Sequence, residues 1–432
     1  MPVILNRNGA AVSASIVSTL LRMAALFLGT ALLLVTIGLV GSLVPAQMTQ
    51  RGEAEWVIGL VGGVYFMGLA TGSFGASVLL ARVGHVRSFT ALSAIMASSV
   101  LGIALSTHLT VWLVARFAIG ASMGGLYVVI ESWLTLATQS EQRGRVLAVY
   151  QMAVYGGLAL GQLLLAVPDP TGTRRLMMAA GAVCLAAVPV ALTRSEVPPI
   201  TIPETLELGT MARLASLGLF CSGVAGLTNG AIYGVAPAMA AGLGYDDAQV
   251  VLIMLAFVVG GVVFQWPVGK ASDVLDRRLV ISGAASLGTV AAACGLGADG
   301  LWPMVMVASA LGATMFSLYP VAVAYTFDRV APGDVLAAST ALLMVYFLAS
   351  AAGAMMSALA LGAFGPSGFF ASVGIGAASL VAYSLFRAGS DDSIADDDKQ
   401  HAFIVPRTSP LAGELDPRVS EQDRTLGVPR GL

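Results

Sequence analysis

The segment Gly120–Tyr127 reads Gly-Ala-Ser-Met-Gly-Gly-Leu-Tyr, and 192 residues later the segment Gly312–Tyr319 reads Gly-Ala-Thr-Met-Phe-Ser-Leu-Tyr. The same offset relates four further residues of each copy: Thr36, Gly38, Pro45 and Ala46 recur as Thr228, Gly230, Pro237 and Ala238. Chance matches are common in apolar sequence, but one offset shared by separated regions is far harder to obtain by accident. The chain is therefore predicted to contain two copies of one structural unit.

The composition indicates that most of the surface of the chain does not face water. The 432 residues are 57% hydrophobic and only 11% charged, and the mean hydropathy is +0.85, whereas a soluble domain carries roughly 25% charged residues. The formal net charge of -2 gives no reason to expect a nucleic-acid partner. Three cysteines lie in apolar runs without metal-ligand spacing, so we expect free thiols, no metal and no cofactor.

Apolar runs of about 20 residues, the length that crosses a bilayer core, occur twelve times. Lipid offers no partner for unpaired backbone groups, so these runs should be helices. The expected fold is an all-α membrane protein with twelve transmembrane helices in two parallel six-helix pseudo-repeats, since six is even and both copies start on the same side. The expected spans are 23–44, 56–80, 88–107, 110–134, 145–167, 176–193, 214–242, 249–268, 279–296, 301–325, 335–361 and 367–386.

Basic residues predict the orientation of these helices. If the N-terminus is cytoplasmic, the outer loops carry only Arg51, Arg174 and Arg175, and the cytoplasmic segments carry most of the remaining Arg and Lys. Both termini are thus expected in the cytoplasm. The expected division is a cytoplasmic N-terminus at 1–22, an N-terminal half at 23–193, a cytoplasmic linker at 194–213, a C-terminal half at 214–387, and a disordered, acidic cytoplasmic tail at 388–432.

The loop after the eighth run resembles a signature of the major facilitator superfamily. That family places Gly, three residues, Asp and then basic residues after its second and eighth helices, as in Gly269-Lys-Ala-Ser-Asp273 followed by Arg277 and Arg278. The first copy departs from the pattern, because Ser77 and Ala81 stand at the Gly and Asp positions, although Arg82 remains. Arg116 and Gly120 match a family Arg-x-x-x-Gly pattern in the fourth helix.

Four segments resemble, more narrowly, the bacterial YcaD-like transporters of this superfamily. They are Glu131–Leu134, Arg143–Tyr150, Asn229–Gly234 and Gln265–Gly269. The resemblance covers about residues 23–387 and implies a multi-pass protein of the bacterial inner membrane.

The resemblance implies a secondary active or facilitative transporter of a small molecule, in which two halves rock around a midplane cavity. Proton-coupled uptake or efflux stays open, as does a non-transporting membrane sensor or scaffold with the same fold. Expected partners are a small-molecule substrate, membrane lipid and a candidate proton, with no nucleic acid and a monomeric state. No enzyme is expected, because the chain has no nucleotide-binding loop and its three histidines are scattered.

The candidate cavity residues come from the four helices that face the cavity in this family. Arg116 is costly within a membrane span and so predicts anion binding or modulation of proton coupling, the alternative being an arginine that snorkels outward or bonds carbonyls. Tyr127 and Tyr319 are repeat mates and should face each other across the pseudo-axis. The full candidate set is Arg116, Tyr127, Asn229, Tyr233, Tyr319, Thr36 and Thr228.

A second set of residues is predicted to form a cytoplasmic gate. Glu131 could carry a proton after desolvation, but the resemblance favours a gate role in which it pairs with Arg82, Arg143 or Arg145. Asp328 is the analogue in the second half, near Arg277 and Arg278. Asp273 is expected to cap the N-terminus of the eleventh helix, where the helix dipole stabilises an anion.

Overall fold

A computed structural model describes residues 16–138, 142–169, 171, 173–193, 214–331 and 334–388. This part of the chain forms twelve helices, and each of them is long and apolar enough to cross a membrane. The twelve-helix prediction is confirmed. The helices are α1 (Ile16–Gln50), α2 (Glu55–Val83), α3 (His85–Leu105), α4 (Leu109–Ala137), α5 (Arg143–Leu164), α6 (Thr173–Ala191), α8 (Ser216–Gly242), α9 (Asp247–Val274), α10 (Arg277–Gly295), α11 (Leu301–Phe327), α12 (Val335–Phe364) and α13 (Pro366–Ala388).

The first helix is longer than the sequence suggested. α1 begins at Ile16, so the segment 16–22, expected as part of a cytoplasmic N-terminus, continues the helix ahead of its apolar run. The expectations for the linker at 194–213 and for the tail beyond residue 388 lie outside the described residues, as do those for the first fifteen residues.

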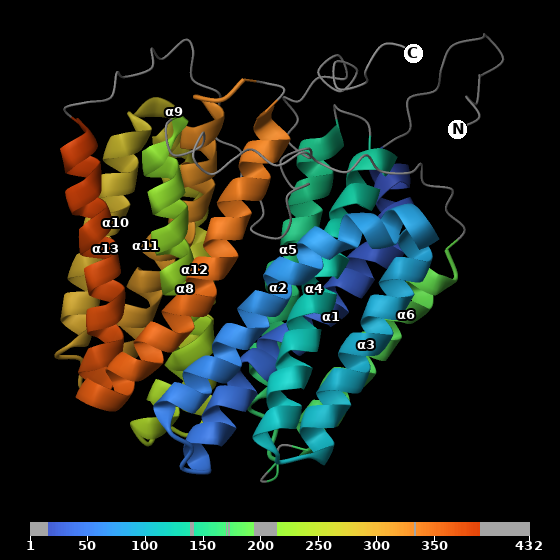
Figure 1. The fold of residues 1–432 in the computed structure, drawn as a ribbon, viewed down its shortest axis with the longest axis horizontal. Helices are drawn as coiled ribbons and strands as arrows, with labels where there is room; N and C mark the ends of the chain where they lie inside the picture. The colour runs from blue at the N-terminus through green and yellow to red at the C-terminus, as the bar shows by residue number, and fades with distance from the viewer. Residues whose placement is uncertain are drawn as a thin grey trace.

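The helices form two six-helix bundles that lie side by side (Figure 1). Helices α1–α6 form the N-terminal half, drawn from blue to green, and α8–α13 form the C-terminal half, drawn from yellow-green to red. The bundles lean together at the end where α1 turns into α2 and diverge at the end where α2 turns into α3 (Figure 1). We call the first end the closed face. We call the second the basic face, since Arg82, Arg277 and Arg278 lie there.

The two halves repeat the same atomic contacts at the offset seen in the sequence. A Cβ atom on Gly120 in α4 would collide with the Tyr65 carbonyl oxygen of α2, and one on Gly312 in α11 would collide with the Phe257 carbonyl oxygen of α9. Both partners of the second contact are displaced by 192 residues from those of the first. Two more contacts obey the rule: Gly38 against Leu158, and Gly230 against Ser350. In lipid the hydrophobic effect does not drive helices together, so membrane helices associate by close packing at small residues such as these glycines.

The halves meet at the closed face through α2 and α12, α2 and α8, and α1 and α8. A Cβ atom on Gly62 of α2 would lie 3.1 Å from the Gly234 Cα of α8, and one on Gly63 would lie 3.0 Å from the Ala351 carbonyl oxygen of α12. At these two positions α2 therefore packs against α8 and α12 without room for a side chain, which closes the space between the halves there.

Candidate functional site

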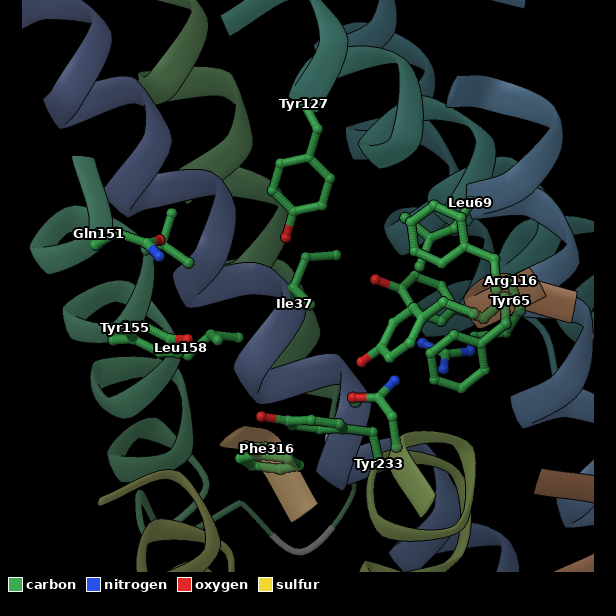
Figure 2. A pocket seen from close by; sticks show the side chains of 16 residues that line it. Ile37, Tyr65, Leu69, Arg116, Tyr127, Gln151, Tyr155, Leu158, Tyr233 and Phe316 are labelled. Carbon is green, nitrogen blue, oxygen red and sulfur yellow. The ribbon is translucent and has the colours of Figure 1, made fainter. Parts of the chain in front are cut away.

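A cavity of about 130 Å³ lies between the two halves. Both bundles contribute to its wall: α1, α2, α4 and α5 from one half, and α8, α11 and α12 from the other. Figure 2 shows Tyr127 entering from one side, Gln151 and Tyr155 from α5 opposite Arg116 and Tyr65, and Tyr233 with Phe316 across one end. The lining residues are Ile37, Gly41, Tyr65, Phe66, Leu69, Arg116, Tyr127, Gln151, Val154, Tyr155, Leu158, Asn229, Tyr233, Phe316, Tyr346 and Phe347.

Four of the residues expected from the sequence line this cavity: Arg116, Tyr127, Asn229 and Tyr233. Three others do not. The Thr36 hydroxyl donates to the Ala179 carbonyl oxygen of α6 at 2.8 Å, and the Thr228 hydroxyl lies 3.9 Å from the Met315 Sδ of α11. Each threonine is buried against a neighbouring helix of its own half and therefore points away from the space between the halves.

The expected Tyr127–Tyr319 pair across the cavity is not formed. Tyr127 lines the cavity, but the Tyr319 ring is fully buried and packs against the Tyr346 ring with centroids 4.9 Å apart. Tyr346 itself lines the cavity, so Tyr319 stands behind the wall. The repeat relates positions along the chain, but the neighbours differ: Tyr346, which packs on Tyr319, stands where the first copy has Val154.

The cavity wall also contains residues from helices other than the four that were expected to face it. Tyr65 and Phe66 come from α2, Gln151 and Tyr155 from α5, and Phe347 from α12. The sequence of α5 could have indicated two of them, since Gln151 and Tyr155 stand four residues apart in a mainly apolar run and must share one helix face.

Arg116 is a buried cation without an acidic partner. Its side chain is only 3% exposed, and its guanidinium lies over the Tyr65 ring at 4.6 Å from the centroid. Its Nε has no hydrogen-bond partner, and among the described residues no carboxylate pairs with it. A cation–π contact contributes about 0.5–2 kcal/mol, less than the several kcal/mol needed to desolvate an ion. The cation–π contact therefore does not offset the cost of burying the Arg116 charge.

Other polar groups of the wall are also open to a ligand. Asn229 and Tyr127 are buried, line the cavity, and form no side-chain hydrogen bond with the residues that the structure describes. Tyr155 is engaged, because its hydroxyl donates to the Gln265 Oε1 of α9 at 3.2 Å and so links the two halves. Buried polar groups are normally satisfied, so Asn229 and Tyr127 favour a polar ligand or water in this space.

The gate residues of the C-terminal half form a buried ion pair. The Arg277 Nε and the Asp328 Oδ2 lie 2.6 Å apart, and both side chains are 2% exposed. Arg278 pairs instead with Asp276 in its own turn, at 2.8 Å. Asp273 is half-buried near the end of α9, and its proposed capping of α12 stays a prediction.

The gate residues of the N-terminal half are arranged differently. Glu131 is fully buried and accepts a hydrogen bond from the Tyr150 hydroxyl of α5 at 2.8 Å. Arg143 is buried. Arg82 and Arg145 are exposed, and in the described part of the chain neither forms an ion pair with Glu131. The expectation of such a pair for these two arginines is thus not met in this conformation.

His85 occupies the position of Arg277 in the first copy, 192 residues earlier. Its Nε2 lies 2.9 Å from the Ser132 Oγ of α4, and its ring packs edge-on against Trp133. Position 277 thus holds an ion pair between α10 and α11, whereas position 85 holds a histidine–serine hydrogen bond between α3 and α4. The offset of 192 residues already relates these two positions in the sequence.

Comparison with known proteins gives concordant results. The family model of the Major Facilitator Superfamily matches residues 26–214 and 218–415. An uncharacterized MFS-type transporter of Enterobacter sp. (strain 638) is 31% identical over 77% of this chain and 87% of its own length. The MFS-type transporter YcaD of Salmonella enteritidis PT4 is 29% identical over 77% of this chain and 87% of its own length.

Two solved structures share the fold. A crystal structure of the nucleoside transporter NupG matches with a TM-score of 0.68 at 11% identity, over 85% of this chain and 99% of that one. A bacterial homologue of the lysosomal transporter Spinster, in an inward-facing and unoccupied conformation, matches with a TM-score of 0.59 at 15% identity, over 95% and 99% of the chains. Together with the twelve helices and the 192-residue repeat, these matches show that the chain is a multi-pass membrane protein of the Major Facilitator Superfamily, similar to its bacterial YcaD-type members.

Proposed function

We propose that the chain transports a small molecule by alternating access, with the two halves rocking about the cavity between them. One observation carries the proposal: the cavity is lined by both halves and holds polar groups that have no partner among the described residues, and the halves pack closely at the closed face but diverge toward the basic face (Figure 1). A static scaffold does not need a cavity between its halves that is lined by unpartnered polar groups. Rocking would break the closed-face contacts and expose the same groups to the other side.

An ion pair joins the two halves at the closed face. The Arg175 Nη2 of α6 lies 2.6 Å from the Asp247 Oδ2 of α9, with side chains 5% and 33% exposed. Arg175 is held in place because its Nε donates to the Val167 carbonyl oxygen at 2.7 Å and its backbone N–H donates to Asp169. Arg175 was expected in an outer loop, as one of the few basic residues there, but it lies in α6. We propose that its contact with Asp247 acts as a latch between the halves.

Asp247→Asn is expected to shift the conformational equilibrium toward opening at the closed face by about 5- to 30-fold, because the ion pair exists only while that face is shut. The range corresponds to about 1–2 kcal/mol, a charged hydrogen bond reduced by the exposure of Asp247. A cysteine reporter measures the shift. Gly41 lines the cavity, and a Cβ atom there meets nothing within 4 Å, so Gly41→Cys fits on a background in which Cys184 and Cys294 are replaced by serine.

Labelling of this reporter by a membrane-impermeant maleimide, applied from each side of the membrane, tests the proposal. In the otherwise unchanged chain the reporter should react from the basic face, and with Asp247→Asn it should react more from the closed face. Arg175→Asp combined with Asp247→Arg should restore the original pattern. If the reporter reacts from the same face in every variant, access to the cavity does not alternate between the two faces. A non-transporting sensor then becomes the better description.

The basic face is proposed to be cytoplasmic, with both chain termini on that side. Support comes from Arg82, Arg277 and Arg278 at this face, since cytoplasmic loops carry the excess of basic residues. A reporter enzyme fused at the C-terminus and active only in the cytoplasm should be active; activity of a periplasm-specific reporter at the same site would reverse the assignment.

A further inference from the structure

We propose that the cavity binds a small aromatic monocarboxylate, with its carboxylate on Arg116 and its ring between the aromatic side chains of the wall. The inference rests on the proposed function in that the bound molecule is the one transported. It goes further by naming the chemical class from the charge, the shape and the unpartnered groups of the cavity.

The charge of the cavity wall selects an anion. Arg116 is the charged member of the lining, and none of the lining residues is Asp or Glu. A buried cation without a counterion is costly, and a carboxylate that accepts two parallel N–H bonds from a guanidinium is the geometry that best offsets this cost. One carboxylate neutralises Arg116, whereas a dianion such as a phosphate monoester would leave a net negative charge buried. The balance of charge therefore favours a monoanion.

The internal repeat argues that Arg116 is not needed for packing. The equivalent position in the second copy is Ala308, which is buried in α11. The same helix unit thus packs with a small apolar side chain at this place. Tyr65, which lies beneath the guanidinium, is matched by Phe257 in the second copy. Both copies therefore have an aromatic ring at this place, but only the first has a cation above it. An arginine present in only one of two matched sites, and turned into the cavity, points to a ligand.

The shape of the cavity selects a flat ring. Eight of the sixteen lining residues are aromatic, and the Tyr233 and Phe316 rings lie parallel, with an angle of 5° between their planes and centroids 5.8 Å apart. The volume of about 130 Å³ is close to that of an engineered cavity of about 150 Å³ that takes up benzene. Rings favour stacked or edge-to-face neighbours, so one aromatic ring fits this wall better than an extended chain or a sugar.

The amide of Asn229 and the hydroxyl of Tyr127 add two neutral polar groups to the cavity wall. In Figure 2 the Tyr127 hydroxyl points into the space between α5 and Arg116. Among the described residues neither group has a side-chain hydrogen-bond partner, so both can bind a hydroxyl or amino substituent on the ring. A ring that carries such a substituent is expected to bind more tightly than the bare one.

The first experiment measures binding to the purified full-length chain in detergent, with benzoate, 4-hydroxybenzoate and phenylacetate as probes and their carboxamides as neutral isosteres. Ligand-dependent shifts of the unfolding temperature give the affinities. At least one carboxylate should bind about 10- to 100-fold more tightly than its carboxamide, the range expected for charge-assisted hydrogen bonds. Equal binding of acids and amides, or no binding of any carboxylate, would overturn the inference without any mutant.

Variants locate the effect at Arg116. Arg116→Gln should remove the preference for the acid over the amide, and Arg116→Lys should retain part of it, since lysine keeps the charge and loses the planar fork. The matched control is Arg51→Gln, because Arg51 also lies over an aromatic ring, 4.8 Å from the Trp112 centroid, but is exposed and outside the cavity wall. An unchanged acid preference in a folded Arg116→Gln protein would refute the assignment.

Transport is measured separately, so that the two proposals can fail independently. Counterflow of labelled benzoate or 4-hydroxybenzoate in proteoliposomes should follow the binding preference. Arg116-dependent binding without counterflow would reject the transport proposal and retain the ligand class. Cavity labelling that alternates between the faces, together with no binding of any aromatic carboxylate, would retain transport and reject the ligand class.

Discussion

Asp328→Ala should lower the free energy of unfolding by about 3–5 kcal/mol, the cost of leaving a buried charge without its partner. Arg277 would keep its positive charge at a position where its side chain is 2% exposed. Its contact with the Ser272 hydroxyl, at 3.4 Å, is long and neutral. Unfolding of the purified protein by increasing denaturant in detergent measures the loss.

A matched pair on the same helix turn provides the control. Arg278 and Asp276 lie 2.8 Å apart, with side chains 11% and 31% exposed, and Asp276 also caps α10 by accepting from the Arg278 backbone N–H. Asp276→Ala should therefore cost about 1–2 kcal/mol, the sum of an exposed ion pair and an N-cap. Arg277→Met combined with Asp328→Leu should recover most of the loss, because apolar residues can replace a buried ion pair. A similar loss for Asp328→Ala and Asp276→Ala would mean that burial does not set the strength of this contact.

Gly157→Ala should destabilise the N-terminal half by about 1–3 kcal/mol, the range for overpacking a well-filled contact. A Cβ atom there would collide with the Ala31 carbonyl oxygen of α1 and lie 2.8 Å from the Leu34 Cβ. The backbone carbonyl of Ala31 cannot rotate away as a side chain could. The α1–α5 pair would have to separate, and the same denaturant titration measures the cost.

The neighbouring glycine isolates the effect of this contact. A Cβ atom on Gly156 meets nothing within 4 Å, so Gly156→Ala changes only the helix propensity and should stabilise by about 0.5–1 kcal/mol. The propensity term is the same for both variants, since both positions lie inside α5. The difference between them is therefore the steric cost. Two variants of equal stability would show that α1 and α5 do not approach as closely as described.

The sequence predicted the fold because its signal is repeated many times. A span of about 20 apolar residues has one stable solution in lipid, and twelve such spans leave little freedom. The offset of 192 residues added the two-fold arrangement, which Gly120 on Tyr65 and Gly312 on Phe257 reproduce atom for atom. Arg116 and Asn229 could be singled out because polar groups are rare and costly in spans.

The sequence could not predict which faces of the helices meet. Thr36, Thr228 and Tyr319 looked as suitable for the cavity as Tyr127, yet they pack within the halves. Gln151 and Tyr155 reach the cavity from α5, a helix that the repeat did not single out. A hydropathy pattern gives the length of a span and little about its rotation when every side is apolar.

The sequence by itself determined the number of spans, their two-copy arrangement and the presence of an arginine within a membrane span. These properties depend on local chemistry: the transfer of side chains to lipid and the cost of a buried charge. Only the tertiary structure decided that Arg116 stands over Tyr65 in an aromatic cavity, that Arg277 pairs with Asp328, and that Arg175 joins Asp247 across the halves. These pairings depend on how helices distant in sequence rotate and approach, which close packing of small residues controls and a linear pattern does not encode.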